Sequence, residues 1–235
     1  MESFNIRDLK DGSDMEIEYK ILKKEEIESL NRDNNVLFHG TNYQSLTASP
    51  EEIRRMFEAS TYIKDYVFNY LREHRLEKRV RDFIQSEDAL MIIDNEQMSE
   101  YGFFYSTYNL AVAYHYCDDN FGWIGFLAEI AINAMKELEL EFDDDRLYRY
   151  IFYYQNHIER YKKAQKVIIV FEDVDDKDLL SIGKDYMIKN DDCRYSGKAI
   201  LEKDFKTMID ALATPKEKRL IEKEYLSNIQ KDKEL

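Results

Sequence analysis

Breaks in regular secondary structure are scarce in this sequence. Only seven glycines and two prolines are spread over 235 residues, and these residue types most often interrupt helices and strands. We therefore expect long helices and strands joined by short polar turns. Hydrophobic residues make up 44% of the chain, enough for a sizeable core, which excludes the disordered and fibrous classes. No linker or shift in composition divides the chain, so one domain over residues 1–235 is predicted.

Helical periodicity and capping residues locate the helices. Ser49 as N-cap and Pro50 at the first helical position begin a helical pattern over residues 50–86. Helical spacing returns over residues 123–163, where Asp145 is the expected cap of the second half. Shorter helices are predicted at 109–117 and 215–230.

Short apolar or aromatic runs predict the strands. The clearest are at 36–38, 102–107, 166–171 and 198–201. The run at 36–38 is broken by His39, Gly40 and Thr41, so we expect this strand to end in a loop there. Polar residues at strand ends often carry chemistry, which makes this loop a candidate site.

Charge and cysteine content restrict the setting and the partners. The formal net charge of −14 disfavours duplex DNA, which a basic face would have to hold. Cys117 and Cys193 are too few for a disulfide framework, which fits a reducing compartment. The start of the sequence lacks a basic segment followed by an apolar run, and no stretch resembles a membrane helix. We expect a soluble cytoplasmic protein without membrane contact.

Several common catalytic patterns are missing from the sequence. The histidines at 74, 115 and 157 are isolated, with no HExxH spacing, so no metal site is expected. No P-loop, Rossmann glycine pattern or nucleophile elbow is present either.

Two segments together resemble a known family. VLFHGT at 36–41, followed by GFFYSTYNLAVAY at 102–114, is similar to the NAD-binding core of the ADP-ribosyltransferases. The resemblance is closest to the diphtheria-toxin and poly(ADP-ribose) polymerase branch, known for a His, Tyr, Glu signature. HGT alone is common, and the ordered pair of segments carries the specificity. The resemblance implies an α+β fold with a split, mostly antiparallel sheet around an NAD cleft, and helical insertions near 50–86 and 123–163.

The resemblance assigns roles to the HGT residues. It implies that His39 hydrogen-bonds a ribose hydroxyl of NAD and that the backbone of Gly40 receives the nicotinamide amide. A ring nitrogen can donate to a hydroxyl, and glycine lets a ligand approach the backbone. Thr41 would orient His39 or cap the following turn. The structural alternative for His39 is a buried side chain satisfied by a nearby carbonyl.

The second segment supplies aromatic and hydroxyl groups. By resemblance, Tyr105 and Tyr114 form the walls against which the nicotinamide ring stacks, a role suited to flat amphipathic rings. Tyr116 is an alternative to Tyr114, because the spacing from Tyr105 does not choose between them. Ser106 and Thr107 would brace the strand end and a catalytic carboxylate, or serve as ordinary strand-end hydroxyls.

The catalytic glutamate is where this sequence departs from the family. The family places it on a late strand, where it stabilises the oxocarbenium-like transition state. A strict register puts Lys198 at that position, so we predict that Glu202, at the far end of the strand, is the catalytic residue. The alternatives are Glu172 and the pair Asp191 and Asp192.

The resemblance also implies an activity and a setting. We expect an NAD-dependent mono-ADP-ribosyltransferase that modifies a macromolecule of its own cell, as a toxin of a toxin–antitoxin or phage-defence system, with an antitoxin as a further partner. The net charge favours a protein acceptor, and RNA stays open because residues 72–81 are basic. The rivals are an NAD hydrolase and a non-catalytic helical interaction protein.

Overall fold

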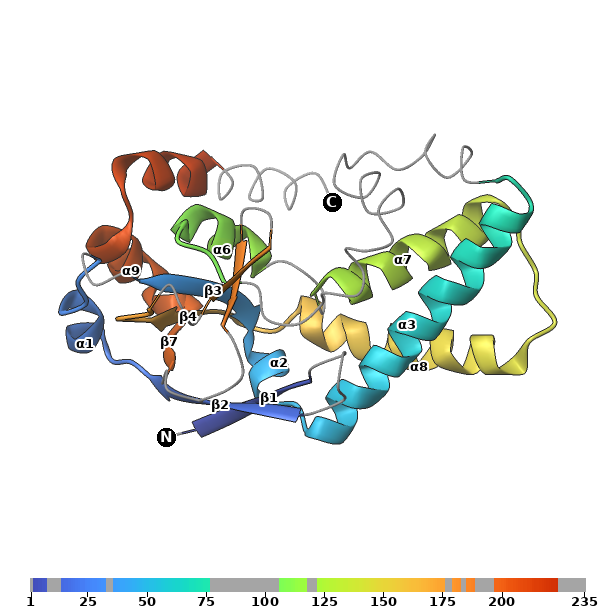
Figure 1. Ribbon diagram of the computed structural model, residues 1–235, viewed down its shortest axis with the longest axis horizontal. Coiled ribbons are helices and arrows are strands. Elements are labelled where there is room, and N and C mark those ends of the chain that lie inside the picture. The colour runs from blue at the N-terminus through green and yellow to red at the C-terminus, as the bar shows by residue number, and fades with distance from the viewer. Residues whose placement is uncertain are drawn as a thin grey trace.

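The computed structural model describes residues 2–7, 14–32, 36–76, 106–117, 122–175, 179–182, 185–188 and 197–223. Two parts lie side by side in Figure 1: a β-sheet with short helices, and a group of three long helices. Helices and a mostly antiparallel sheet thus occur together, as predicted for the fold class. None of the described helices is both long and apolar enough to cross a membrane.

Five of the described strands form one sheet. The described strands are β1 (Glu2–Arg7), β2 (Asp14–Ile21), β3 (Leu37–Asn42), β4 (Lys166–Phe171), β5 (Leu179–Ile182), β6 (Asp185–Ile188) and β7 (Gly197–Leu201). The sheet has the order β1-β2-β7-β4-β3, and β5 pairs with β6 separately. All neighbours are antiparallel except β2 and β7. The predicted strands at 166–171 and 198–201 are confirmed and pair with each other.

The strand that carries HGT is longer than predicted. β3 pairs with β4 along its whole length, and His39 lies opposite Ile169 while Gly40 lies opposite Ile168. The loop expected at His39–Thr41 is therefore wrong. Hydrogen bonding to the buried backbone of β4 extends the strand through polar residues, whose side chains alternate between the two faces.

Apolar side chains cover both faces of the sheet. On the face that we call the α6 face lie three short helices, α1 (Lys24–Glu28), α6 (Leu110–Tyr116) and α9 (Phe205–Leu212). The opposite face, which we call the His39 face, is covered by α2 (Tyr43–Thr47) and by apolar residues near β5. Strand residues buried on the α6 face are Phe38, Ile168, Val170 and Ile200. Those buried on the His39 face are Tyr19, Leu37, Val167, Ile169, Phe171 and Ala199.

Helix α6 lies in close contact with β3 at Gly40. A Cβ atom on Gly40 would lie 1.8 Å from the carbonyl oxygen of Ala113 and 2.8 Å from its carbonyl carbon. The missing side chain is what lets the helix backbone rest against the strand. α6 begins as predicted, because the Oδ1 of Asn109 accepts a hydrogen bond from the Ala111 N–H.

The three-helix part consists of α3 (Pro50–Glu73), α7 (Gly122–Glu137) and α8 (Asp145–Lys162). The Ser49 hydroxyl accepts from the Glu52 N–H at 3.2 Å, which confirms the predicted start of α3. The cap of α8 is Asp144 rather than the predicted Asp145. Only the residue before the first turn can reach back to the N–H groups of the second and third helical residues.

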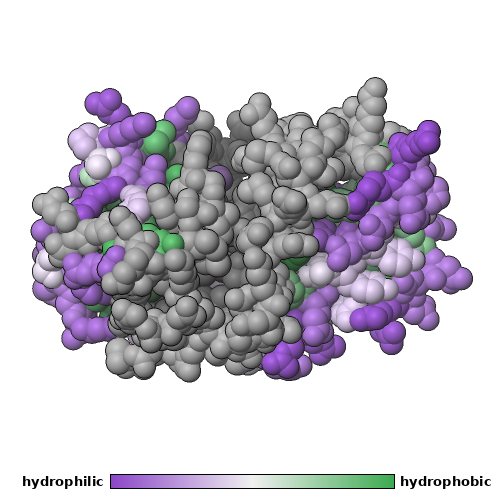
Figure 2. All heavy atoms as spheres, viewed as in Figure 1, coloured by the Kyte–Doolittle hydropathy of each residue, from purple (hydrophilic) through white to green (hydrophobic). Residues whose placement is uncertain are grey.

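These three helices have an apolar cluster of their own. Its buried members come from α3, α7 and α8, among them Ile63, Leu127 and Leu147. The hydroxyl of Tyr154 donates to the carbonyl of Gly125 at 2.7 Å inside the cluster. On the face shown in Figure 2, the described residues of this part are mainly hydrophilic. The helices thus form a core beside the sheet.

The packing at Gly40 predicts a difference between two glycines. Gly40→Ala should destabilise the fold by about 3 kcal/mol, because the new Cβ meets helix backbone that has little room to retreat. Gly197→Ala meets only side-chain atoms, with the Cγ2 of buried Ile169 at 2.6 Å, and these give way more easily than helix backbone, so a smaller loss of about 2 kcal/mol is expected. Urea unfolding measures both, and equal losses would contradict the close packing of α6.

Candidate functional site

The two segments of the family resemblance meet at the outer edge of the sheet. The N–H of Phe38 donates to the carbonyl of Thr107 at 2.8 Å, and the N–H of Thr107 donates to the carbonyl of Phe38 at 2.9 Å. β3 is the last of the described strands in the sheet, so this antiparallel bridge lies on the side of β3 that faces away from β4. His39 and Gly40 follow one bridge residue directly, and Ser106 precedes the other.

The bridge fixes the direction of the backbone groups of Gly40. Along an antiparallel strand, the N–H and C=O of one residue point to one edge, and those of the next residue point to the other. Phe38 directs both of its groups to Thr107, so Gly40, two residues on, directs both of its groups to the same outer edge. Among the described residues, neither group of Gly40 has a hydrogen-bond partner. A ligand at this edge would meet one backbone donor and one acceptor.

Side chains at the bridge divide between the two faces of the sheet. Phe38 belongs to the α6 face, so alternation places His39 and Thr41 on the opposite face. The same alternation applies to the extended segment 106–107, so the side chains of Ser106 and Thr107 point to opposite faces of the sheet. His39 and Thr41 are partly exposed, whereas Ser106 is completely buried. Within the part of the chain that the structure describes, the hydroxyl of Ser106 has no hydrogen-bond partner, although buried hydroxyls almost always have one.

Thr107 has a structural contact. Its Oγ1 accepts a hydrogen bond from the Asn109 N–H at 3.1 Å, which shapes the turn into α6. This agrees with the reading of Thr107 as a strand-end hydroxyl, and its bracing of a carboxylate stays a prediction.

Of the two tyrosines expected to stack on nicotinamide, the structure describes only Tyr114. Tyr105 lies outside the described residues. Tyr114 is 6% exposed, and its ring centroid lies 5.8 Å from that of Phe205 on the α6 face. The ammonium of Lys166 lies 5.5 Å from the centre of the Tyr114 ring. Tyr114 thus belongs to the core beneath α6, while Tyr116 on the same helix is partly exposed.

The strand order keeps the predicted carboxylates away from His39. Glu202 begins the short helix η3 (Glu202–Asp204) after β7, is exposed, and accepts from the Lys166 N–H at 3.3 Å. β4 lies between β3 and β7, which separates those strands by about 10 Å. Glu172 forms an ion pair with Lys198. The residue of β7 in the same row as His39 is Ala199, across Ile169.

The remaining alternatives for the catalytic carboxylate are the neighbouring residues Asp191 and Asp192. Asp191 and Asp192 lie outside the described residues. Within the described ranges, no group of three or more His, Cys, Asp or Glu side chains is gathered as a metal site.

An ion pair with a buried carboxylate holds the start of α6, and sequence reasoning missed it. Glu217 accepts hydrogen bonds from the guanidinium of Arg32 and from the N–H groups of Leu110 and Thr214. Thr214 and Glu217 have the spacing of a capping box for the helix at 215–223, a signal visible in the sequence. No local signal connects Glu217 to Arg32, because 185 positions separate them.

Hydrogen bonds decide the ionisation of Glu217. Burial acts to raise the pKa of its carboxyl, but the hydrogen bonds from Arg32, Thr214 and Leu110 outweigh burial and hold the pKa below its ordinary value of 4.5. The folded protein therefore favours the ionised carboxylate.

The chain was compared with protein families, curated proteins and solved structures. No family model, curated protein or solved structure matches the chain.

The lowered pKa of Glu217 predicts an acid-dependent loss of stability. Its contribution is present above about pH 4.5 and is lost as the pH falls through the lower pKa of the folded state. Urea unfolding between about pH 3 and pH 7 should therefore show a smaller acid loss in Glu217→Gln than in the wild type. Glu222→Gln, at an exposed position of the same helical segment, is the control. An acid loss unchanged by Glu217→Gln would contradict the assignment.

Proposed function

We propose that the chain binds NAD at the outer edge of β3, cleaves its nicotinamide glycosidic bond and transfers ADP-ribose to a macromolecule. The Phe38–Thr107 bridge carries this proposal. It makes neighbours of the two segments whose combination resembles the ADP-ribosyltransferases. A coincidental resemblance would not require the two segments to meet.

The backbone of Gly40 suits an amide ligand. Its outward N–H and C=O form a donor and acceptor pair, and a carboxamide such as that of nicotinamide offers the complementary acceptor and donor. The missing side chain of Gly40 faces Ala113 rather than this edge, and that contact already demands glycine for packing.

The hydroxyl of Ser106 supports a polar ligand at the same edge. A buried hydroxyl without a partner destabilises a protein by about 1–3 kcal/mol. A ligand that hydrogen-bonds Ser106 would recover this energy on binding. Since Ser106 precedes the bridge residue Thr107, such a ligand would lie beside β3.

His39 would hydrogen-bond a ribose hydroxyl of NAD, as the resemblance implies. Its side chain starts from a strand that is paired along its whole length with buried β4, so its position is well defined. Partial exposure leaves the ring accessible to a ligand.

Neither of the described candidate carboxylates, Glu202 and Glu172, lies beside His39. Cleavage through an oxocarbenium-like transition state needs negative charge close to the ribose. Glu202 remains our predicted residue, and it would need a ligand that extends across β4 to the end of β7.

The placement of the carboxylates favours a second candidate, an NAD-binding protein without transferase activity. Glu202→Gln, Glu172→Gln, Asp191→Asn and Asp192→Asn distinguish the two functions. One variant with turnover lowered at least about a hundredfold and unchanged NAD affinity identifies the catalytic group. NAD binding without turnover in the wild type supports the second candidate.

The acceptor and the setting follow from charge and resemblance. A net charge of −14 favours a protein acceptor, and the proposed setting is a toxin of a toxin–antitoxin or phage-defence system. Part of the basic segment, Arg72 to Leu76, lies at the end of α3 in the three-helix part. An RNA acceptor would give modification that depends on this segment.

Incubation with labelled NAD and a cell lysate tests the activity. We expect label in the protein fraction, and at least about a hundredfold less with His39→Ala, which should stay folded because a partly exposed side chain contributes little to the core. Label that resists protease and is released by ribonuclease would indicate an RNA acceptor. Free ADP-ribose without labelled macromolecule would indicate NAD hydrolysis. Unchanged turnover in a folded His39→Ala would refute the assigned site.

Ser106→Ala should separate stability from binding. Removing a buried hydroxyl without a partner should stabilise the free protein by up to about 1 kcal/mol. The same change should weaken NAD binding about tenfold, because a hydrogen bond to the ligand is lost. Thermal unfolding and NAD titration measure the two effects. Thr107→Ser, which keeps the hydroxyl bound to the Asn109 N–H, is the control.

A further inference from the structure

In the ion pair between Arg32 and Glu217, the carboxylate is almost closed to solvent and the guanidinium is partly exposed. The Glu217 side chain is 6% exposed and that of Arg32 is 28% exposed. The guanidinium contacts both carboxylate oxygens, the two-point geometry that makes such pairs strong and directional. Arg32 also donates to the carbonyl of Leu212 at 2.6 Å, at the end of α9.

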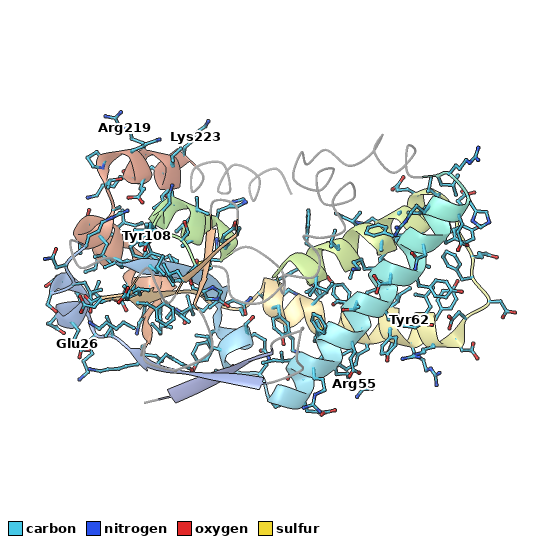
Figure 3. The ribbon with its side chains drawn as sticks, in the orientation of Figure 1. Glu26, Arg55, Tyr62, Tyr108, Arg219 and Lys223 are labelled. Carbon is cyan, nitrogen blue, oxygen red and sulfur yellow. The ribbon has the colours of Figure 1, made fainter. Side chains whose placement is uncertain are left out.

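The pair holds the segment that follows the bridge. Arg32 donates to the carbonyl of Tyr108 at 2.9 Å, and Glu217 accepts from the N–H of Leu110 at 2.8 Å. Both contacts lie within three residues of Thr107. Figure 3 labels Tyr108 on the side of the molecule where the C-terminal helices lie.

Arg32 also touches the other partner of the bridge. Its guanidinium carbon lies 5.5 Å from the centre of the Phe38 ring, within the range of a cation–π contact. Phe38 is fully buried, so this contact is sheltered from water. One ion pair therefore contacts β3 on one side of the bridge and residues 108–110 on the other.

We propose that Arg32 and Glu217 are positioning residues, which hold residues 106–110 in register against β3 and so keep Ser106 beside the outer edge of Gly40. This inference rests on the proposed function. The bridge itself is isolated, with two backbone hydrogen bonds between described residues. Without the ion pair, the start of α6 would lose hydrogen bonds at Tyr108 and Leu110 together.

The inference gives the C-terminal helical segment a role at the NAD site. Glu217 belongs to the helix at 215–223 and reaches Leu110 across 107 positions of sequence. A change at Glu217 should thus act on NAD binding through residues 106–110.

Glu217→Gln in the full chain tests the inference. Gln keeps the size of the side chain but loses the charge that Arg32 needs. Thr214→Ala is the comparison variant: it removes the hydroxyl that caps the same helix, together with its hydrogen bond to Glu217, and leaves the contacts of Glu217 with Arg32 and Leu110 in place. Two quantities are measured, NAD affinity by titration and hydrogen exchange at the amides of Phe38 and Thr107.

Exchange at both amides should be about tenfold faster in Glu217→Gln, with the amides of the β4–β7 ladder unchanged. The Kd for NAD should rise about tenfold, whereas Thr214→Ala should change each quantity less than about twofold. If Glu217→Gln does not fold, Arg32→Lys serves instead, since lysine cannot span both carboxylate oxygens and the Tyr108 carbonyl.

Unchanged exchange would overturn the inference whatever happens to NAD affinity. Faster hydrogen exchange with unchanged NAD affinity would also overturn it, because NAD binding would then not depend on the position of residues 106–110. If the wild type does not bind NAD, the proposed function fails and with it the role at the site. The exchange data then decide separately whether the pair orders residues 106–110.

Discussion

The carboxylate of Glu217 is almost completely buried, so its charge has to be balanced and each oxygen hydrogen-bonded. Arg32 balances the charge, and the N–H groups of Leu110 and Thr214 and the Thr214 hydroxyl donate the remaining hydrogen bonds. These partners come from the turn after α1, the start of α6 and the C-terminal helical segment. The buried carboxylate of Glu217 is thus stabilised only when three distant parts of the chain are in place.

The position of α6 depends on this network and on Gly40 together. The ion pair holds the first turn of α6, and the missing side chain of Gly40 lets Ala113 lie against β3. The same glycine directs its backbone N–H and C=O to the outer edge. Packing thus depends on the missing side chain of Gly40, whereas the proposed ligand site uses its backbone N–H and C=O. The packing contact alone is enough to require glycine there.

Much of the secondary structure could be predicted because its causes are local. The apolar run at 166–171, the Ser49 cap and the Asn109 start of α6 all lie within a few residues of the structure they determine. The extent of β3 could not be predicted in this way. His39 and Thr41 look like loop residues, and only pairing with β4 places them in a strand.

The sequence by itself determined most of the helices and the apolar strands at 166–171 and 198–201, and it singled out His39–Thr41 and Tyr105–Thr107 as candidate residues. Tertiary structure decided that the two segments meet at Phe38 and Thr107, that Tyr114 lies in the core, and that Glu202 ends two strands away from β3. The physical reason is the range of the interactions. Caps and periodicity act over one or two turns, whereas strand order and the Arg32–Glu217 pair join residues far apart in the chain, and no local pattern records them.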